Sequence, residues 1–161
     1  MEKFQVRTIQ KEDDPLIAGV IRSVLEEFGV NRPGTVYTDP ATDHISDLLE
    51  TPETAYWVVE SEDKLIGGAG IYPTDGLPEG YVELVKLYVL NEFRGKRIGK
   101  MLIEKCISRA GELGYRHMYL ETMPELAQAV GLYESLGFKK IDERLGESGH
   151  FSCHIWMVKD L

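Results

Sequence analysis

Four cationic side chains fall within seven residues near the middle of an otherwise acidic chain. They are Arg94, Lys96, Arg97 and Lys100, in the stretch LNEFRGKRIGKMLIEKC that runs from residue 90 to residue 106. An apolar run precedes this stretch, and an amphipathic pattern follows it. Arginine and lysine donate charge-assisted hydrogen bonds to phosphates and carboxylates. The spacing therefore predicts an anion-binding turn between a strand and a helix.

The helix that is expected to begin near Ile98 would strengthen such a site. Its first N–H groups have no carbonyl partner within the helix, and the helix dipole adds positive potential at the same end. Gly95 and Gly99 remove side chains that would hold an anion at a distance. The alternative is a plain solvent-exposed helix start, but basic residues in a first turn oppose the dipole. The stretch thus favours an anion site, and a pyrophosphate would fit it.

Two familiar phosphate-binding loops do not match this turn. A Walker A loop needs four residues between its glycines and a Ser or Thr after the lysine. Here three residues separate Gly95 from Gly99, and Met101 follows Lys100. The GxGxxG spacing of a dinucleotide-binding turn is also missing. We therefore reject an NTPase and a dinucleotide-dependent dehydrogenase.

The pattern of the remaining chain predicts an α+β domain in which three consecutive strands are joined by loops. The strand at residues 81–90 is apolar on both faces, as expected for a central buried strand. The glycines Gly67, Gly68 and Gly70 indicate a bulge or a close approach of backbone in the strand before it. The expected helices span residues 11–29, with a cap at Asp13 or Asp14, and residues 43–50, 98–113 and 124–137. The expected strands span residues 4–9, 55–61, 64–73, 81–90, 116–122, 138–143 and 152–159.

Composition limits the class of protein. A chain of 161 residues is expected to form one domain over residues 1–161. The net charge of −9 argues against nucleic-acid binding. No apolar run approaches the ~18 residues of a membrane span, so no membrane association is expected. Cys106 and Cys153 are far apart and form no CxxC, which favours a reducing compartment and a cytoplasmic location.

Two segments together resemble the GCN5-related N-acetyltransferases, the GNAT family. They are LYVLNEFRGKRIGKMLIEKCISRAGELGYRHMYLET and the later AVGLYESLGFKKI. The family motif, Gln or Arg followed by x-x-Gly-x-Gly/Ala, falls on Arg94 to Gly99, with Arg97 in place of the usual first glycine. The resemblance implies a mixed, mostly antiparallel sheet of about seven strands flanked by about four helices. It also implies that the fourth and fifth strands splay apart.

The resemblance further implies acetyl-CoA as cosubstrate, with no metal. The pantetheine arm would pair with the fourth strand, and the pyrophosphate would lie on the amides of the basic turn. Leu126 stands where many relatives carry an asparagine that contacts the coenzyme, so that contact is in doubt. The implied cofactor-binding residues are Leu87, Tyr88, Val89, Arg94, Gly95, Lys96, Arg97, Ile98, Gly99 and Lys100.

The implied reaction is attack of a neutral amine on the thioester within a ternary complex. Glu83 is the candidate base, because an apolar setting should raise its pKa. Its alternative roles are a carboxylate at the rim or an ion pair with Lys86. Tyr133 is the candidate acid that protonates the leaving thiolate, and its alternative role is core packing. Backbone N–H groups of the fourth strand would stabilise the oxyanion.

Several residues and partners stay open. His117, His150 and His154 match no zinc spacing, so surface or core roles are expected. Glu121 is expected to be a solvated charge. The acceptor is an amine of a small molecule or a peptide, and exposed sheet edges would allow a homodimer. The alternative function is a catalytically inactive acyl-CoA-binding sensor or interaction module, which would not need Glu83 and Tyr133 to meet at the cofactor sulfur.

Overall fold

The computed structural model describes residues 3–161, which form a mixed seven-stranded sheet in the order β1-β2-β3-β4-β5-β7-β6. All neighbouring strands are antiparallel except β4 and β5, which are parallel. This arrangement confirms the expected fold. The strands are β1 (Phe4–Thr8), β2 (Ala55–Ser61), β3 (Lys64–Tyr72), β4 (Tyr81–Val89), β5 (His117–Thr122), β6 (Lys139–Ile141) and β7 (Ile155–Asp160).

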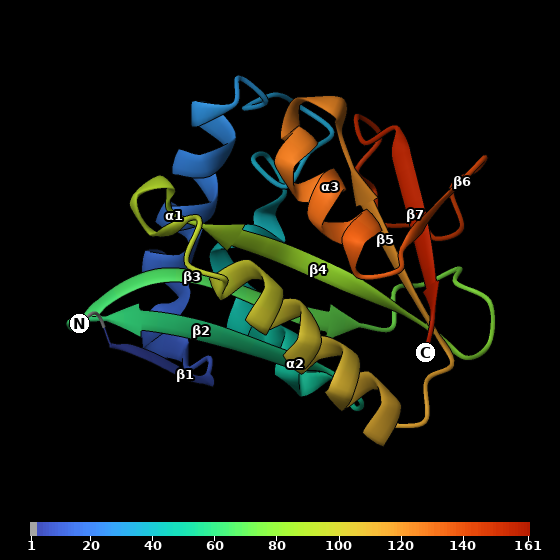
Figure 1. Cartoon of the computed structure of the whole chain (residues 1–161), viewed down its shortest axis with the longest axis horizontal. Coiled ribbons are helices and arrows are strands. Elements are labelled where there is room, and N and C mark those ends of the chain that lie inside the picture. The colour runs from blue at the N-terminus through green and yellow to red at the C-terminus, as the bar shows by residue number, and fades with distance from the viewer. Residues whose placement is uncertain (1–2) are drawn as a thin grey trace.

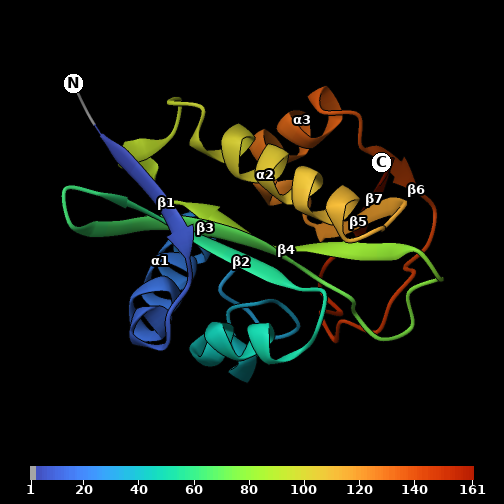
Figure 2. The ribbon, with the colours of Figure 1, turned by 90° about the horizontal axis from the view of Figure 1, so that it is seen from below.

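Helices cover both faces of the sheet. Figure 2 shows α1 and the segment before β2 on one face, with α2 and α3 on the other. No helix within residues 3–161 is long and apolar enough to cross a bilayer. The α-helices are α1 (Asp14–Glu27), α2 (Ile98–Glu112) and α3 (Ala127–Ser135), and the 3-10 helices are η1 (Lys11–Asp13), η2 (Pro40–Glu50), η3 (Asn91–Phe93) and η4 (Pro124–Leu126).

Each face of the sheet has its own hydrophobic core. In α1, Ile17, Ile21 and Leu25 recur every four residues, so they form one stripe, and all three are fully buried against the sheet. On the opposite face, Leu102 and Ile103 of α2 are fully buried in a second cluster. The sheet is therefore clamped between two helical layers.

The parallel contact between β4 and β5 is short. The two strands pair at only three positions, from Tyr81 opposite His117 to Glu83 opposite Tyr119. Beyond Glu83, β4 continues to Val89 while β5 runs away from it, as Figure 1 shows. The expected splay between the fourth and fifth strands is thus confirmed, and it opens a notch in the middle of the sheet.

A bulge in β4 lies at the edge of this notch. The register between β3 and β4 shifts between Gly68 and Gly70, and Lys86 has a left-handed φ of 51°. A Cβ on Gly68 would lie 2.8 Å from the ring of Tyr56, and a Cβ on Gly70 would lie 2.5 Å from it. The Tyr56 hydroxyl donates a hydrogen bond of 2.7 Å to the carbonyl oxygen of Lys86. The glycines therefore mark both a bulge and a close approach, as the sequence predicted.

Candidate active site

The notch between β4 and β5 contains a cavity of about 440 Å³. It is lined by β4 from Glu83 to Val89, the basic turn, the start of α2, the end of β5, and parts of α1 and α3. All the predicted site residues except Lys96 line this cavity. Lys96 instead lies with its ammonium 5.8 Å from the centre of the Phe93 ring.

Glu83 is a buried carboxyl group at the point where β4 and β5 separate. It is 5% exposed, and Thr74 donates a hydrogen bond of 2.7 Å to its Oε1. Burial, with a smaller contribution from the negative charge of Glu121, raises the pKa of Glu83 to about 7, against the opposing effect of Thr74. A carboxyl group with this pKa exchanges a proton readily near neutral pH.

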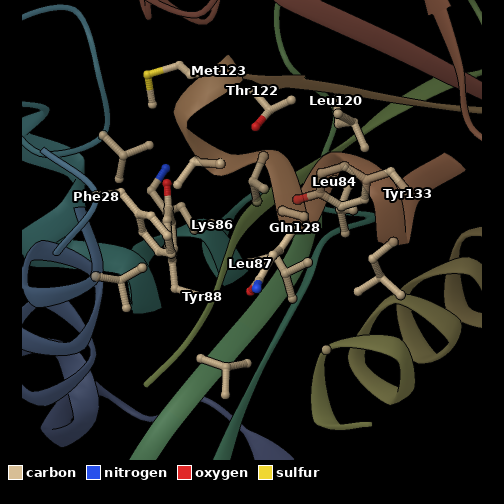
Figure 3. A pocket seen from close by; sticks show the side chains of 18 of the residues that line it. Phe28, Leu84, Lys86, Leu87, Tyr88, Leu120, Thr122, Met123, Gln128 and Tyr133 are labelled. Atoms are coloured by element: carbon tan, nitrogen blue, oxygen red, sulfur yellow. The ribbon is translucent and has the colours of Figure 1, made fainter. Parts of the chain in front are cut away.

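Tyr133 approaches the same cavity from α3. Its ring packs edge-on against Phe138, with centroids 5.8 Å apart, and the residue is 7% exposed. In Figure 3 its hydroxyl points into the cavity from the side of α3. Burial raises the pKa of Tyr133, so the phenol keeps its proton at neutral pH. The side chain therefore combines core packing with a hydroxyl donor that faces the cavity.

The basic turn is held to α1 by Arg94. Its guanidinium forms a bidentate ion pair with Glu27, at 2.7 and 2.8 Å, and Nε donates to the carbonyl oxygen of Val89 at 3.0 Å. The same group lies 5.0 Å over the ring of Phe28. The Arg94 side chain is thus already engaged within the protein, whereas Arg97 and Lys100 also line the cavity.

Backbone conformation shapes the end of the turn. Arg97 precedes α2 with a φ of 65° and Gly95 has a φ of 78°, both in the left-handed region. This conformation explains why glycine is the usual residue at the position of Arg97, since a Cβ makes it strained. The first closing hydrogen bond of α2 runs from the Met101 amide to the Arg97 carbonyl, at 3.0 Å, so the preceding amides have no such partner in the helix.

Gly99 sits where α2 approaches α3. A Cβ at this position would lie 3.3 Å from a methyl group of Leu132. The glycine therefore permits close packing of the two helices beside the exposed amides of the turn.

Two further polar side chains, Lys86 and His150, line the cavity. The Nε2 atom of His150 lies 2.8 Å from the carboxylate of Asp39. The hydrogen bond from His150 lowers the pKa of Asp39 to about 2. The expected surface or core role of His150 is therefore replaced by a position on the cavity wall. The spacing in sequence gave no sign of this, because Asp39 lies 111 residues away.

Glu121 differs from its expected role as a solvated charge. Its side chain is only 2% exposed. Tyr119 donates a hydrogen bond of 2.6 Å to it, Ser148 donates another, and the Arg144 guanidinium lies 3.4 Å away. The carboxylate thus anchors the loop before β7 to the end of β5, because Ser148 and Arg144 come from that loop.

A family model described as the acetyltransferase (GNAT) family matches residues 20–138. The chain belongs to the GNAT family. It is therefore an acyltransferase, and the resemblance noted in its sequence is confirmed.

Individual relatives agree with this assignment. The uncharacterized N-acetyltransferase YjgM of Escherichia coli strain K12 is 40% identical over 157 residues, which are 97% of this chain and 94% of that protein. A GNAT-family acetyltransferase of Staphylococcus aureus Mu50 has a TM-score of 0.87 at 19% identity, with 99% of each chain covered. The PaiA N-acetyltransferase of Thermoplasma acidophilum, solved with coenzyme A, has a TM-score of 0.74 at 17% identity, again with 99% of each chain covered.

The structure places residues at the cavity that were not predicted from the sequence. Gln128 and Thr122 line the cavity, and Figure 3 shows the Gln128 amide beside Leu87. Gln128 lies two positions after Leu126, so it supplies a polar group near the position where many relatives carry an asparagine. Lys86 was considered only as a partner for Glu83. The only feature of the sequence that could have indicated a site role for Gln128 is that it is a polar residue in a helix expected beside the notch.

The cavity has no cluster of metal ligands among the residues that the structure describes. Within residues 3–161, no three His, Cys, Asp or Glu side chains are grouped so that they could hold a metal ion.

Proposed function

We propose that this GNAT enzyme is an acetyl-CoA-dependent N-acetyltransferase that acetylates a primary amine by direct attack in a ternary complex. The observation that carries the proposal is the single cavity, opened where β4 leaves β5, that is lined by both Glu83 and Tyr133. The acceptor is an amine of a small molecule or a peptide. The coenzyme A bound to the T. acidophilum relative supports the choice of cosubstrate.

The cofactor would occupy the notch through backbone groups. Within the described chain, the edge of β4 that faces β5 has no ladder partner beyond Glu83, so Leu87, Tyr88 and Val89 are available to pair with the pantetheine amides. The pyrophosphate would bind the free amides at the start of α2, with Arg97 and Lys100 adding charge.

The chemistry divides between the two titratable groups. Glu83 takes a proton from the acceptor ammonium, directly or through a water molecule, and the neutral amine then attacks the thioester carbonyl. The C–N bond forms first and gives a tetrahedral oxyanion, which backbone N–H groups of β4 stabilise. The C–S bond breaks as this oxyanion collapses, and Tyr133 donates its proton to the departing thiolate. The nitrogen loses its extra proton as the amide forms, and this proton returns to the Tyr133 phenolate, directly or through water. The raised pKa values of both groups keep Glu83 near its midpoint and Tyr133 protonated at neutral pH.

The test combines calorimetry with a thiol-release assay. Acetyl-CoA is titrated into the protein, and release of coenzyme A is then followed with a panel of primary amines. Tyr133→Phe should keep the affinity for acetyl-CoA and lower turnover roughly 10²-fold or more. Tyr115→Phe is the matched control, because its hydroxyl bonds to the carbonyl of Glu53 outside the cavity.

The outcomes separate the candidate functions. Absence of acetyl-CoA binding contradicts the proposal altogether. Binding without turnover on any amine favours the inactive acyl-CoA-binding sensor. Turnover that survives in Tyr133→Phe at the rate of the control removes the acid role from Tyr133.

A further inference from the structure

Lys86 is an unusual residue for the middle of a buried strand. It sits at the bulge of β4 with a φ of 51°, a conformation that disfavours any residue with a Cβ. The Tyr56 hydroxyl fixes its carbonyl oxygen, and the ring of Tyr56 is fully buried over two glycines. The fold therefore holds the Lys86 backbone firmly in this strained position.

The bulge directs the Lys86 side chain to the cavity wall on the α1 side. Figure 3 shows it together with Phe28 and Tyr88, whereas Leu84 and Tyr133 lie toward α3. Glu83 lies three residues earlier on the same strand and lines the same cavity. The ammonium of Lys86 and the carboxyl of Glu83 therefore both face the space that the acceptor would enter.

The charge of Lys86 has no direct partner in the part of the chain that is described. Neither a hydrogen bond nor an ion pair engages its ammonium within residues 3–161. Burial lowers the pKa of Lys86, and the negative charges of Asp39 and Glu83 oppose this effect. Asp39 is already bonded to His150 and to the amide of Ala41, and Glu83 is bonded to Thr74. Burial of this partly exposed amine disfavours its charged form, and a ligand that supplies a negative charge would stabilise that form.

We infer that the acceptor of this enzyme carries a carboxylate beside its amine, and that Lys86 binds this carboxylate while Glu83 faces the amine. The inference rests on the proposed function of the same cavity. The substrate class that follows is an α-amino acid or a peptide with an equivalent pair of groups.

The rest of this wall indicates the character of the acceptor side chain. Val24, Phe28, Val36 and Met123 line the α1 side of the cavity. Burial of an apolar substituent against these apolar side chains is favourable, because it removes apolar surface from water. We therefore expect an amino acid with an apolar side chain to bind better than a polar one.

The test uses pairs of substrates that differ only in the carboxylate. They are phenylalanine with phenethylamine, leucine with isoamylamine, and methionine with 3-(methylthio)propylamine. The value of kcat/KM is measured for each member with acetyl-CoA at saturation. We expect each amino acid to exceed its decarboxylated partner by roughly ten- to a hundredfold, the range of a charge-assisted hydrogen bond.

Substitution of Lys86 isolates its contribution. Lys86→Met keeps the length and the unbranched Cβ of the side chain, so the backbone strain is matched. In this variant the preference for the amino acid should fall to roughly threefold or less, because kcat/KM should fall much more for the amino acids than for the decarboxylated amines. Comparing the two ratios cancels the different basicities of the two amines. Lys140→Met, which removes an exposed cation on β6, should leave the preference unchanged.

Separate readouts distinguish the two levels of failure. If acetyl-CoA does not bind by calorimetry, the proposed function itself fails. If acetyl-CoA binds but the decarboxylated amines are used as well as the amino acids, or no amino acid is used or bound, the carboxylate role is wrong. An equal loss for both members of each pair in Lys86→Met also contradicts it, since that pattern indicates a role in catalysis or folding. Thermal unfolding of Lys86→Met and of Lys86→Gln shows whether the fold is retained.

Discussion

The two sides of the cavity differ in how far apart in the sequence their residues lie. The side formed by the basic turn and the start of α2 combines backbone amides and glycines with the cations Arg94, Arg97 and Lys100, all within seven residues of the sequence. Another part of the wall includes Lys86 and His150, and His150 is paired with Asp39, 111 residues away. This difference indicates that the proposed cofactor site is formed by one continuous segment, the basic turn, which can be recognised in the sequence. Acceptor chemistry instead depends on side chains that only the folded chain brings together.

The largest expected effect that tests this contrast follows from Glu83→Gln. Removing the proton acceptor should lower kcat roughly 10²- to 10⁴-fold, while the affinity for acetyl-CoA stays unchanged. In the wild-type enzyme, kcat/KM should fall as the pH drops through about 7, because protonated Glu83 accepts no proton. Thiol-release assays across pH and calorimetry give the two readouts.

A matched substitution controls for the loss of a buried carboxylate. Asp14 is 5% exposed and accepts a hydrogen bond of 2.6 Å from the Ser46 hydroxyl, much as Glu83 accepts one from Thr74. Asp14→Asn should therefore leave kcat close to wild type. A turnover rate in Glu83→Gln that matches this control would falsify the assignment of Glu83 as the base.

The second expected effect is on the free energy of unfolding, and it follows from the cost of burying the ionised form of Glu83. The folded-state pKa of about 7 lies above the ordinary value of 4.5, so the contribution of Glu83 to stability is present below pH 4.5 and lost as pH rises through 7. Glu83→Gln has no such titration. Its free energy of unfolding relative to wild type should therefore rise with pH by about 3 kcal/mol between pH 4.5 and pH 8.

Urea denaturation of the two proteins at several pH values measures this difference. A difference that is flat with pH would mean that Glu83 is ionised in the folded protein. In that case the pH dependence of turnover must come from another group.

A smaller effect is expected from Tyr56→Phe, which loosens the bulge of β4. Loss of the hydrogen bond to the Lys86 carbonyl should cost about 1 kcal/mol of stability. The KM for the acceptor should rise more than the dissociation constant of acetyl-CoA, because the bulge positions the acceptor wall. Tyr115→Phe again serves as control, and equal effects on both ligands would remove the distinction between the two sides of the cavity.

The smallest effect concerns Arg97→Gly on the cofactor side. Glycine relieves the left-handed φ of 65°, so stability should change by no more than about 1 kcal/mol, in the stabilising direction. The affinity for acetyl-CoA should fall severalfold, because one cation leaves the turn. Glu53→Gly, at an exposed position with a φ of 63°, gives the same backbone relief without touching the cavity. Unchanged affinity in Arg97→Gly would mean that the backbone alone holds the anion.

The contrast between the two sides also explains what could be predicted from the sequence. The order of strands and helices and the turn at Gly95 follow from local patterns, so they were predictable. The splay of β4 from β5 was implied only by the resemblance to the GNAT family. The segment at residues 43–50 was expected as a short helix, and the structure extends it into the 3-10 helix η2 with a kink at His44.

The features that could not be predicted from the sequence depend on contacts between residues that lie far apart in it. Glu121 looked solvated because its partners, Ser148 and Arg144, lie in a loop whose path no local pattern specifies. The Arg94 side chain looked available for an anion because its partner Glu27 is 67 residues away. In each case burial and pairing depend on segments that meet only in the folded chain.

The short seam between β4 and β5 has a mechanical consequence. Three residue pairs join the strands β1 to β4 to the strands β5 to β7, so the hydrogen-bonded seam between the two parts of the sheet is short, although both parts share the core beneath α2. The cavity lies just beyond this seam, and both parts of the sheet supply its walls. A molecule lodged there contacts both parts, and its binding free energy adds to the cohesion between them. A ligand in the notch would therefore stabilise the contact between the two parts of the sheet, and its release would remove that stabilisation.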